Sequence, residues 1–151
     1  MAVRVQADDF DAGVEMARLR AADPGVGAVA TFVGVVRDLN DDASVSSLTL
    51  EHYPGMTEKA LEAIEAEARQ RFDVRGIVIV HRVGPLAPGD PIVLVAVTSA
   101  HRGAAFDACR FVMDYLKTRA PFWKKERTPQ GERWVEARDS DEDSAAAWSP
   151  R

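Results

Sequence analysis

Two lysines on either side of a proline break are the residues best suited to chemistry in this sequence. Lys117 lies near the end of a segment with helical spacing of apolar residues, and Lys124 follows the break at Pro121. Alternation along the strand after the break puts Phe122, Lys124 and Glu126 on one face, so both lysines can converge on one cleft. A lysine becomes an acid–base group when burial or a neighbouring cation lowers its pKa from about 10.4. The pair therefore predicts a site for proton transfer or for stabilisation of negative charge. The alternative interpretation is that both are ordinary surface lysines without a catalytic role.

A histidine and an arginine stand where a predicted strand ends and a helix begins, in the sequence Thr98 to Gly103. The free backbone N–H groups in the first turn of a helix favour an anion. Arg102 adds a planar guanidinium suited to phosphate or carboxylate, and His101 adds a further donor. This segment indicates a site for a small anion, although a solvated helix start carries the same residue types.

Metal and nucleophilic catalysis find little support in the sequence. His52, His81 and His101 fall in separate predicted elements without the spacing of zinc ligands, so we expect no metal site. Cys109 lies on an apolar helical stripe, where a buried thiol stays protonated, and its expected role is packing. The motifs of serine hydrolases and of dinucleotide-binding folds are missing.

Three helices and a C-terminal hairpin are predicted to position these residues. The helices are expected from Asp9 or Asp11 to residue 22, over 57–72 and over 99–119, and the strands over 26–36, 47–53, 77–83, 92–98, 122–127 and 133–138. The expected buried faces are Phe10, Val14 and Ala17 in the first helix and Phe106, Cys109, Met113 and Leu116 in the third. The strand over 26–36 is rich in β-branched residues and reads as buried on both faces. The fold class is α+β, a single domain over 1–138, with 139–151 as an acidic, flexible tail.

The composition excludes several classes of protein. The chain has 151 residues, 46% of them hydrophobic and 28% charged, which is typical of one soluble globular domain. We expect no membrane span, no signal peptide and a reducing cytoplasm, because apolar runs are short and there is a single cysteine. The net charge of −5 argues against nucleic-acid binding, which needs a broad basic face. Residues 101–138 are nonetheless basic, which suits one small anionic ligand.

Three stretches of the sequence resemble the catalytic large subunit of molybdopterin synthase. They are LTLEHYPGMT over 48–57, TSAHR over 98–102 and MDYLKTRAPFWKKE over 113–126, and the similarity extends from about residue 27 to 138. The resemblance implies an α/β-hammerhead-like fold. It also implies a sulfurtransferase that converts cyclic pyranopterin monophosphate into molybdopterin by adding two sulfur atoms as a dithiolene, a step of molybdenum cofactor biosynthesis. No cofactor is implied for this transfer.

The resemblance also implies partners and roles for individual residues. The sulfur donor is the C-terminal thiocarboxylate of a small ubiquitin-like subunit, and the assembly is a heterotetramer built on a homodimer of the large subunit. Lys117 and Lys124 match the catalytic lysines. Substrate-binding positions are matched by Val35, Val36, Arg37, His101, Arg102, Lys117, Lys124, Lys125 and Glu126, and supporting pocket positions by Phe32, Met113 and Arg138.

Two other functions fit parts of the sequence. A catalytically silent scaffold would bind the ubiquitin-like tail without turning over a pterin, and the intact lysines and Arg102 argue against it. A single-stranded RNA-binding protein would use Trp123 and the basic segment, and the acidic net charge argues against that. Whether Lys117 acts as acid, base or covalent partner is left open by the sequence.

Overall fold

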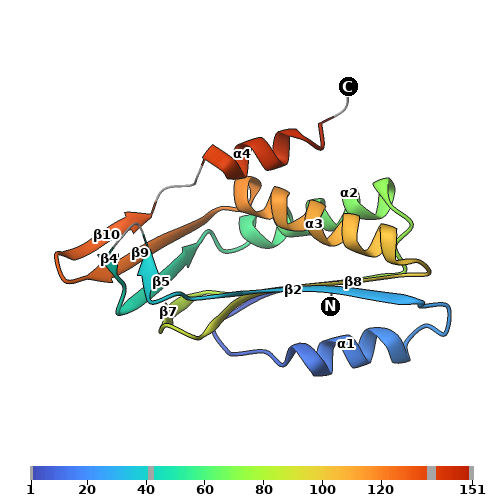
Figure 1. Ribbon diagram of the computed structural model, residues 1–151, viewed down its shortest axis with the longest axis horizontal. Helices are drawn as coiled ribbons and strands as arrows, with labels where there is room; N and C mark the ends of the chain where they lie inside the picture. The colour runs from blue at the N-terminus through green and yellow to red at the C-terminus, as the bar shows by residue number, and fades with distance from the viewer. Residues whose placement is uncertain (1, 41–42, 136–138, 150–151) are drawn as a thin grey trace.

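The strands form two four-stranded sheets and one short hairpin, and helices pack against the larger sheet (Figure 1). The computed structural model describes residues 2–40, 43–135 and 139–149. The helices are α1 (Ala12–Ala21), α2 (Met56–Arg71), α3 (Arg102–Arg119) and α4 (Asp139–Ala146). The strands are β1 (Val3–Gln6), β2 (Ala28–Val35), β3 (Leu39–Asn40), β4 (Ala43–Ser44), β5 (Ser47–His52), β6 (Gly76–Arg82), β7 (Gly84–Leu86), β8 (Pro91–Ser99), β9 (Phe122–Thr128) and β10 (Gly131–Val135).

The larger sheet has the order β1-β6-β8-β2, and the smaller one has the order β10-β9-β5-β7. In the larger sheet β1 runs parallel to β6, while β6, β8 and β2 are antiparallel neighbours. The smaller sheet is antiparallel throughout and lies at one end of the larger sheet (Figure 1). The α+β class and the C-terminal hairpin, here β9 and β10, are confirmed.

Alternation along the central strands builds a core on each face of the larger sheet. Ile77 and Ile79 of β6 belong to the main core under α2 and α3, whereas Val80 faces α1 on the opposite side. Figure 1 shows the sheet between α1 on one face and the pair α2 and α3 on the other. None of the helices in the described part of the chain is both long and apolar enough to cross a membrane.

The first helix begins as expected but turns a different face to the core. The Asp11 carboxylate accepts a hydrogen bond from the Val14 N–H at 3.0 Å and caps α1. Phe10 packs against the sheet as predicted, but Val14 is 43% exposed and Ala17 is exposed, while Met16 and Leu19 take their places. The face toward the core includes the carboxylate of Glu15, which pairs with Arg4 of β1 at 2.6 Å. A prediction from the spacing of apolar residues misses this face, because it counts a charged residue as exposed.

Strand β2 is an edge strand and is not buried on both faces, which corrects the expectation for residues 26–36. Within residues 2–40, 43–135 and 139–149 it pairs only with β8, and Phe32, Val33 and Val35 are 42, 38 and 48% exposed. The sequence alone cannot distinguish an apolar strand covered by neighbouring strands from one covered by a second molecule, because both have the same composition. The exposed edge is therefore a surface that the single chain leaves uncovered.

The C-terminal segment contains a helix where we expected a flexible tail. Helix α4 packs along α3, and Trp148 beyond it makes edge-on contacts with Phe72 and Phe111 at 5.6 Å between ring centroids. The Trp148 indole N–H donates to the Asp114 carboxylate at 2.7 Å. The acidic, Ala- and Ser-rich composition did not indicate this packing, because Trp148 is the one aromatic residue of the segment 139–151.

We predict that Trp148→Ala lowers the free energy of unfolding by about 2 kcal/mol, because a half-buried aromatic ring and one hydrogen bond are lost. Trp148→Phe is the matched control, since it keeps the ring contacts and should lose less than half as much. Chemical denaturation of both variants measures the difference. Equal stability of the wild type and a chain truncated before Ser140 would show that the segment does not contribute to the fold.

Candidate active site

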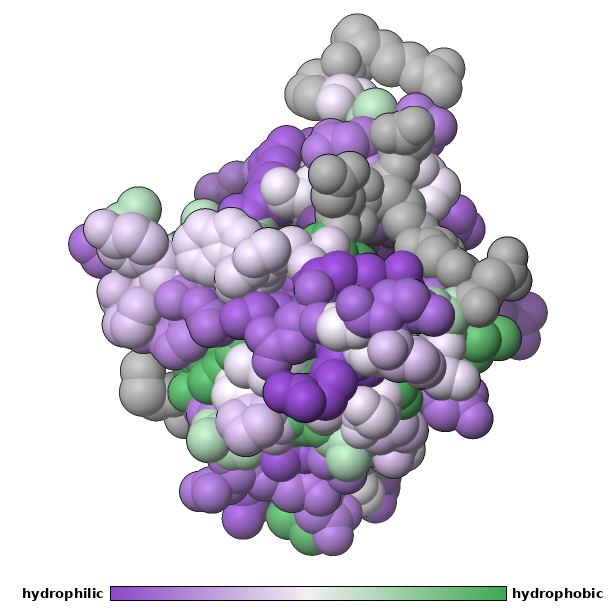
Figure 2. Space-filling model, turned by 90° about the vertical axis from the view of Figure 1, so that its left-hand side faces the viewer, coloured by the Kyte–Doolittle hydropathy of each residue, from purple (hydrophilic) through white to green (hydrophobic). Residues whose placement is uncertain are grey.

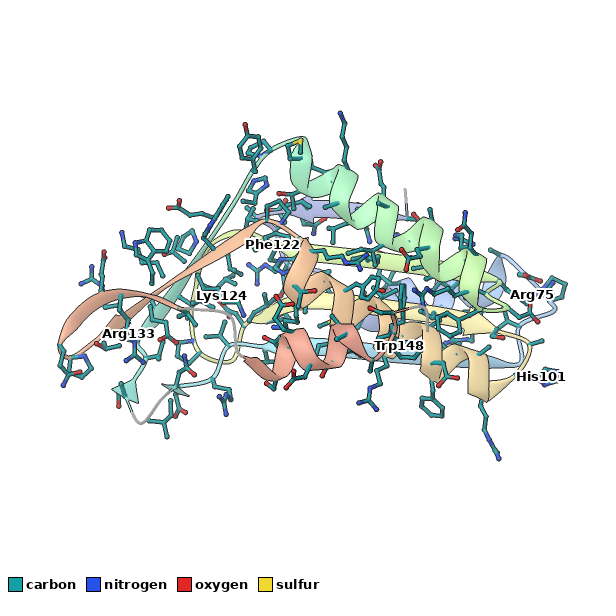
Figure 3. The ribbon with its side chains drawn as sticks, turned by 90° about the horizontal axis from the view of Figure 1, so that it is seen from above. Arg75, His101, Phe122, Lys124, Arg133 and Trp148 are labelled. Atoms are coloured by element: carbon teal, nitrogen blue, oxygen red, sulfur yellow. The ribbon has the colours of Figure 1, made fainter. Side chains whose placement is uncertain are left out.

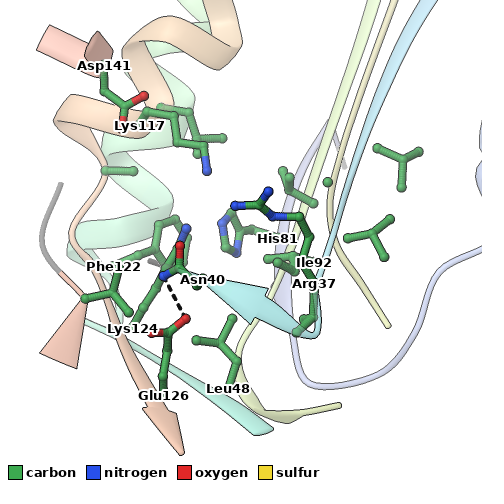
Figure 4. A pocket seen from close by; sticks show the side chains of 18 of the residues that line it. Arg37, Asn40, Leu48, His81, Ile92, Lys117, Phe122, Lys124, Glu126 and Asp141 are labelled. Carbon is green, nitrogen blue, oxygen red and sulfur yellow. Dashed lines mark hydrogen bonds between the residues drawn. The ribbon is translucent and has the colours of Figure 1, made fainter. Parts of the chain in front are cut away.

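A cavity of about 580 Å³ opens where the end of β2, the C-terminal end of α3 and the inner face of β9 meet (Figure 4). Figure 2 looks onto this end of the molecule, where hydrophilic residues gather across the centre of the face. The lining residues that carry polar side chains come from six different elements or loops. They are Arg37, Asn40, His81, Lys117, Lys124, Glu126 and Asp141.

The two lysines reach the cavity from consecutive elements. Lys117 lies in the last turn of α3, which ends before Pro121 because proline lacks the N–H needed to continue a helix. The chain then enters β9, where Lys124 pairs with Leu50 of β5 on one side and Val135 of β10 on the other. Figure 4 shows both side chains directed into the same space, so the convergence predicted from alternation is confirmed.

The cavity changes the acid–base properties of one of these lysines. Burial lowers the pKa of Lys124 from its ordinary 10.5 to about 8, and the neighbouring ammonium of Lys117 contributes to the decrease. The carboxylates of Asp141 and Glu126 act in the opposite direction. Lys124 can therefore exchange a proton near neutral pH.

Arg37 enters the cavity because of an irregularity at the end of β2. The register with β8 shifts between Gly34 and Val35, and the strand then leaves the sheet. The next residue, Val36, is buried, and its backbone is held by the loop before β8, with the Val36 N–H donating to the Asp90 carbonyl at 2.9 Å. Val35, Val36 and Phe32 line the cavity together with Arg37, as expected for this strand segment.

Glu126 lies in the cavity wall with both carboxylate oxygens in use. Asn40 donates its amide to one oxygen at 2.8 Å, and Arg133 of β10 donates to the other at 3.0 Å. Arg133 also donates to the Asn40 backbone carbonyl at 2.8 Å, which ties the segment after Arg37 to the hairpin of β9 and β10. The structure thus gives Glu126 a role in holding the wall, and a substrate contact for it stays a prediction.

Lys125 does not reach the cavity. Alternation places it on the outer face of β9, where its ammonium pairs with Glu132 at 3.1 Å and lies 5.3 Å from the centre of the Trp134 ring. Met113 is also outside the lining, because its side chain is buried in the main core. Arg138 lies outside the described residues.

His101 and Arg102 are not brought to the cavity of their own chain. They stand at the first turn of α3, and Lys117 stands in its last turn, about 22 Å away at 1.5 Å per residue. Figure 3 shows His101 and Lys124 toward opposite ends of the molecule. Both residues are exposed, so any role in binding the same substrate requires a different molecule to present them.

Three polar lining residues were missed by the sequence analysis, namely His81, Asn40 and Asp141. Asp141 lies on α4, a helix that the composition did not predict. Asn40 was missed because it lies in a stretch predicted to be a polar loop. His81 had a usable signal, because it shares its strand face with Ile77 and Ile79 and so had to point to the layer of α2 and α3. Among the residues that the structure describes, no group of three His, Cys, Asp or Glu side chains is arranged as metal ligands.

Cys109 occupies the packing position that its spacing predicts, whereas Phe106, placed on the same buried face by the sequence, is 65% exposed. Its side chain is 7% exposed, its thiol lies 3.8 Å from the Val95 carbonyl, and burial raises its pKa to about 11. The thiol therefore stays protonated and is a poor nucleophile.

We predict that Cys109→Ser retains most of the catalytic activity of the chain and loses about 1 kcal/mol of stability, because a hydroxyl replaces a thiol in an apolar layer. Cys109→Ala is the matched control that removes the sulfur without adding a polar atom. Steady-state rates and thermal unfolding check the two effects. An inactive but folded serine variant would contradict the packing role.

The comparisons with known proteins identify the family of the chain. Residues 5–119 match the family model described as MoaE protein. The molybdopterin synthase catalytic subunit of Pseudomonas aeruginosa is 61% identical over 148 residues, which cover 98% of this chain and 99% of that protein.

Two solved structures extend the match to three dimensions. The MoaE protein of Burkholderia ambifaria has 60% identity and a TM-score of 0.84, with 98% of each chain covered. A molybdopterin synthase structure from Staphylococcus aureus has 32% identity and a TM-score of 0.79, covering 87% of this chain and 95% of that one. The chain therefore belongs to the MoaE protein family.

Proposed function

We propose that this chain is the catalytic subunit of a molybdopterin synthase. It transfers sulfur from the C-terminal thiocarboxylate of a small ubiquitin-like subunit to cyclic pyranopterin monophosphate, and the product is the molybdopterin dithiolene. The observation that carries this proposal is the convergence of Lys117, Lys124 and Arg37 on one cavity. Family membership supports it independently.

The charges of the cavity suit both reactants. A thiocarboxylate and a phosphate are anions, and three cationic side chains facing one space attract both of them and shield their mutual repulsion. The thiocarboxylate sulfur forms a C–S bond to the pterin as a C–O bond of the pterin breaks, and water then cleaves the acyl–sulfur bond, so the small subunit leaves with a C-terminal carboxylate. Two such transfers complete the dithiolene. Negative charge develops on the oxygen that leaves the pterin, and a nearby ammonium stabilises it. Lys117 can deliver the proton to that oxygen, and Lys124, with its lowered pKa, can pass a proton on in the same cavity.

The site also needs a second copy of the chain if His101 and Arg102 bind substrate. Strand β2 joins the two ends involved, since Ala28 pairs with Ser99 just before His101 and Val35 lines the cavity. A two-fold pairing along the exposed edge of β2 places the start of one β2 beside the end of the other. It would cover Phe32, Val33 and Val35 and bring the partner's helix start toward this cavity.

Reconstitution tests the proposed function. Purified chain, the thiocarboxylated small subunit and cyclic pyranopterin monophosphate should together yield a dithiolene product without added metal or cofactor. A chain that binds the small subunit normally but neither binds nor converts the pterin would be the silent scaffold instead. We place the protein in the cytoplasm, because a chain with one cysteine has no intrachain disulfide that would require an oxidising compartment.

The titration of Lys124 provides a prediction that does not depend on turnover. Its ammonium should lose its proton at pH about 8, and Lys117→Gln should raise that pKa because a neighbouring positive charge is removed. The value should stay below 10.5, since burial persists in the variant. Lysine side-chain NMR measures both titrations, and Lys59→Gln on the exposed face of α2 is the matched control. A Lys124 resonance that titrates unchanged in Lys117→Gln would contradict the coupling.

A further inference from the structure

His81 is a buried polar residue in the cavity to which no role has yet been given. It lies on β6 opposite Val93, is 4% exposed, and follows two isoleucines on the same face of the strand. Its ring nevertheless lines the cavity that holds both lysines (Figure 4). A polar side chain in such a place needs a partner or a function.

The hydrogen bonding of the ring fixes its tautomer. Nδ1 lies 2.8 Å from the backbone carbonyl of Arg82, and a carbonyl can only accept, so Nδ1 carries the proton. Nε2 therefore presents a lone pair, and the one hydrogen bond of the ring within the described part of the chain is the one made by Nδ1. The ring also stacks on Phe122, with 3.7 Å between centroids and 16° between planes, so its orientation is held from one face.

The surroundings keep this ring neutral. Burial lowers its pKa to about 3, and the nearby charges of Lys124, Lys117 and His52 act in the same direction. A base this weak cannot hold a proton during turnover, so proton transfer is not its task. What remains is a fixed hydrogen-bond acceptor.

A neutral ring nitrogen is distinctive among the groups around it. Lys117, Lys124 and Arg37 supply cationic donors, and both oxygens of Glu126 are already bonded to Asn40 and Arg133. The other carboxylate of the lining, Asp141, lies beside Lys117 (Figure 4). The anionic groups of a ligand can therefore bind to several cationic side chains, whereas a ring N–H of a heterocyclic ligand can donate a hydrogen bond to Nε2.

We propose that His81 is a specificity-determining residue whose Nε2 accepts a hydrogen bond from a ring N–H of the pterin. The inference rests on the proposed function and deepens it. The cations hold the phosphate and the thiocarboxylate, and His81 orients the heterocycle so that the carbons that receive sulfur face the lysines. Ligands with the phosphate but without the heterocycle gain nothing from His81.

Calorimetric binding of two probes, cyclic pyranopterin monophosphate and inorganic phosphate, tests this assignment. His81→Phe keeps a ring to stack on Phe122 and removes the acceptor, so it should weaken pyranopterin binding about tenfold or more, the loss of one hydrogen bond to a buried site. Phosphate affinity should be unchanged. Arg37→Ala is the contrasting variant, since it should weaken both ligands, and His81→Gln, which restores an acceptor, should recover part of the pyranopterin affinity.

A second measurement needs no variant. The ¹⁵N resonance of His81 Nε2 in the wild type should move when the pyranopterin is added and stay in place when phosphate is added. Wild-type binding of the pyranopterin with no change in His81→Phe and no shift of Nε2 would overturn the role of His81 alone. Failure of the wild type to bind the pyranopterin at all would overturn the proposed function with it.

Discussion

Lys117→Ala is expected to lower the single-turnover rate of sulfur transfer by ~10²–10⁴-fold, the usual loss when a positioned proton-transfer group is removed. Binding of the pyranopterin and of the small subunit should remain largely in place, because Arg37 and Lys124 still line the cavity. Rapid-quench kinetics and separate equilibrium binding measure the two effects. A large loss of binding with a normal rate at saturation would make Lys117 a binding residue only.

Lys117→Arg is the matched control for that prediction. The guanidinium keeps the positive charge and stays protonated, so it cannot exchange a proton during the reaction. The variant should therefore be nearly as slow as Lys117→Ala. Sulfur transfer at the wild-type rate would show that position 117 supplies charge alone.

Mixing two variants that are each impaired at low substrate concentration is expected to restore activity. Arg102→Ala should raise the pyranopterin concentration for half-maximal rate about 10–100-fold, the loss of a charged hydrogen bond to the substrate. In a dimer that combines Arg102→Ala with Lys117→Ala, one cavity has an intact Lys117 and faces the intact Arg102 of its partner. Random exchange makes about half of all dimers mixed, so about a quarter of the wild-type activity should return at low substrate concentration.

The mixing result decides which copy supplies Arg102. If Arg102 served the cavity of its own chain, each chain in the mixed dimer would lack one of the two groups and no activity would return. Mixing Lys124→Ala with Lys117→Ala is the control, since both lysines line one cavity in one chain and no exchange can complete it.

Periodicity predicted the part of the site that lies within one short stretch of chain. The helical stripe that contains Cys109 and the alternation through Phe122, Lys124 and Glu126 were enough to bring Lys117 and Lys124 together. Which residues share a face of one helix or one strand follows from the period of 3.6 or 2 residues, so it can be predicted without knowing the rest of the fold.

Features that depend on distant packing were not predictable in the same way. His81 reads as one residue in an apolar strand, and only the tertiary structure shows that its ring ends in a cavity. The apolar composition of β2 predicts a buried strand, although its edge is exposed. The composition of the α4 segment predicts a flexible tail, and only the contacts of Trp148 with Phe72 and Phe111 show that it packs on the core. The resemblance placed His101 and Arg102 in the same substrate site as Lys117, yet one helix length separates them.

Tracking the sulfur atom tests the central claim most directly. The small subunit, carrying an isotopically labelled thiocarboxylate, is mixed with this chain and cyclic pyranopterin monophosphate, and one turnover is followed by mass spectrometry. Label should leave the small subunit and appear in the dithiolene of the pterin, at the same rate in Cys109→Ser and far more slowly in Lys117→Ala. Label that stays on the small subunit, or that collects on Cys109, would contradict sulfur transfer in the cavity of Lys117 and Lys124.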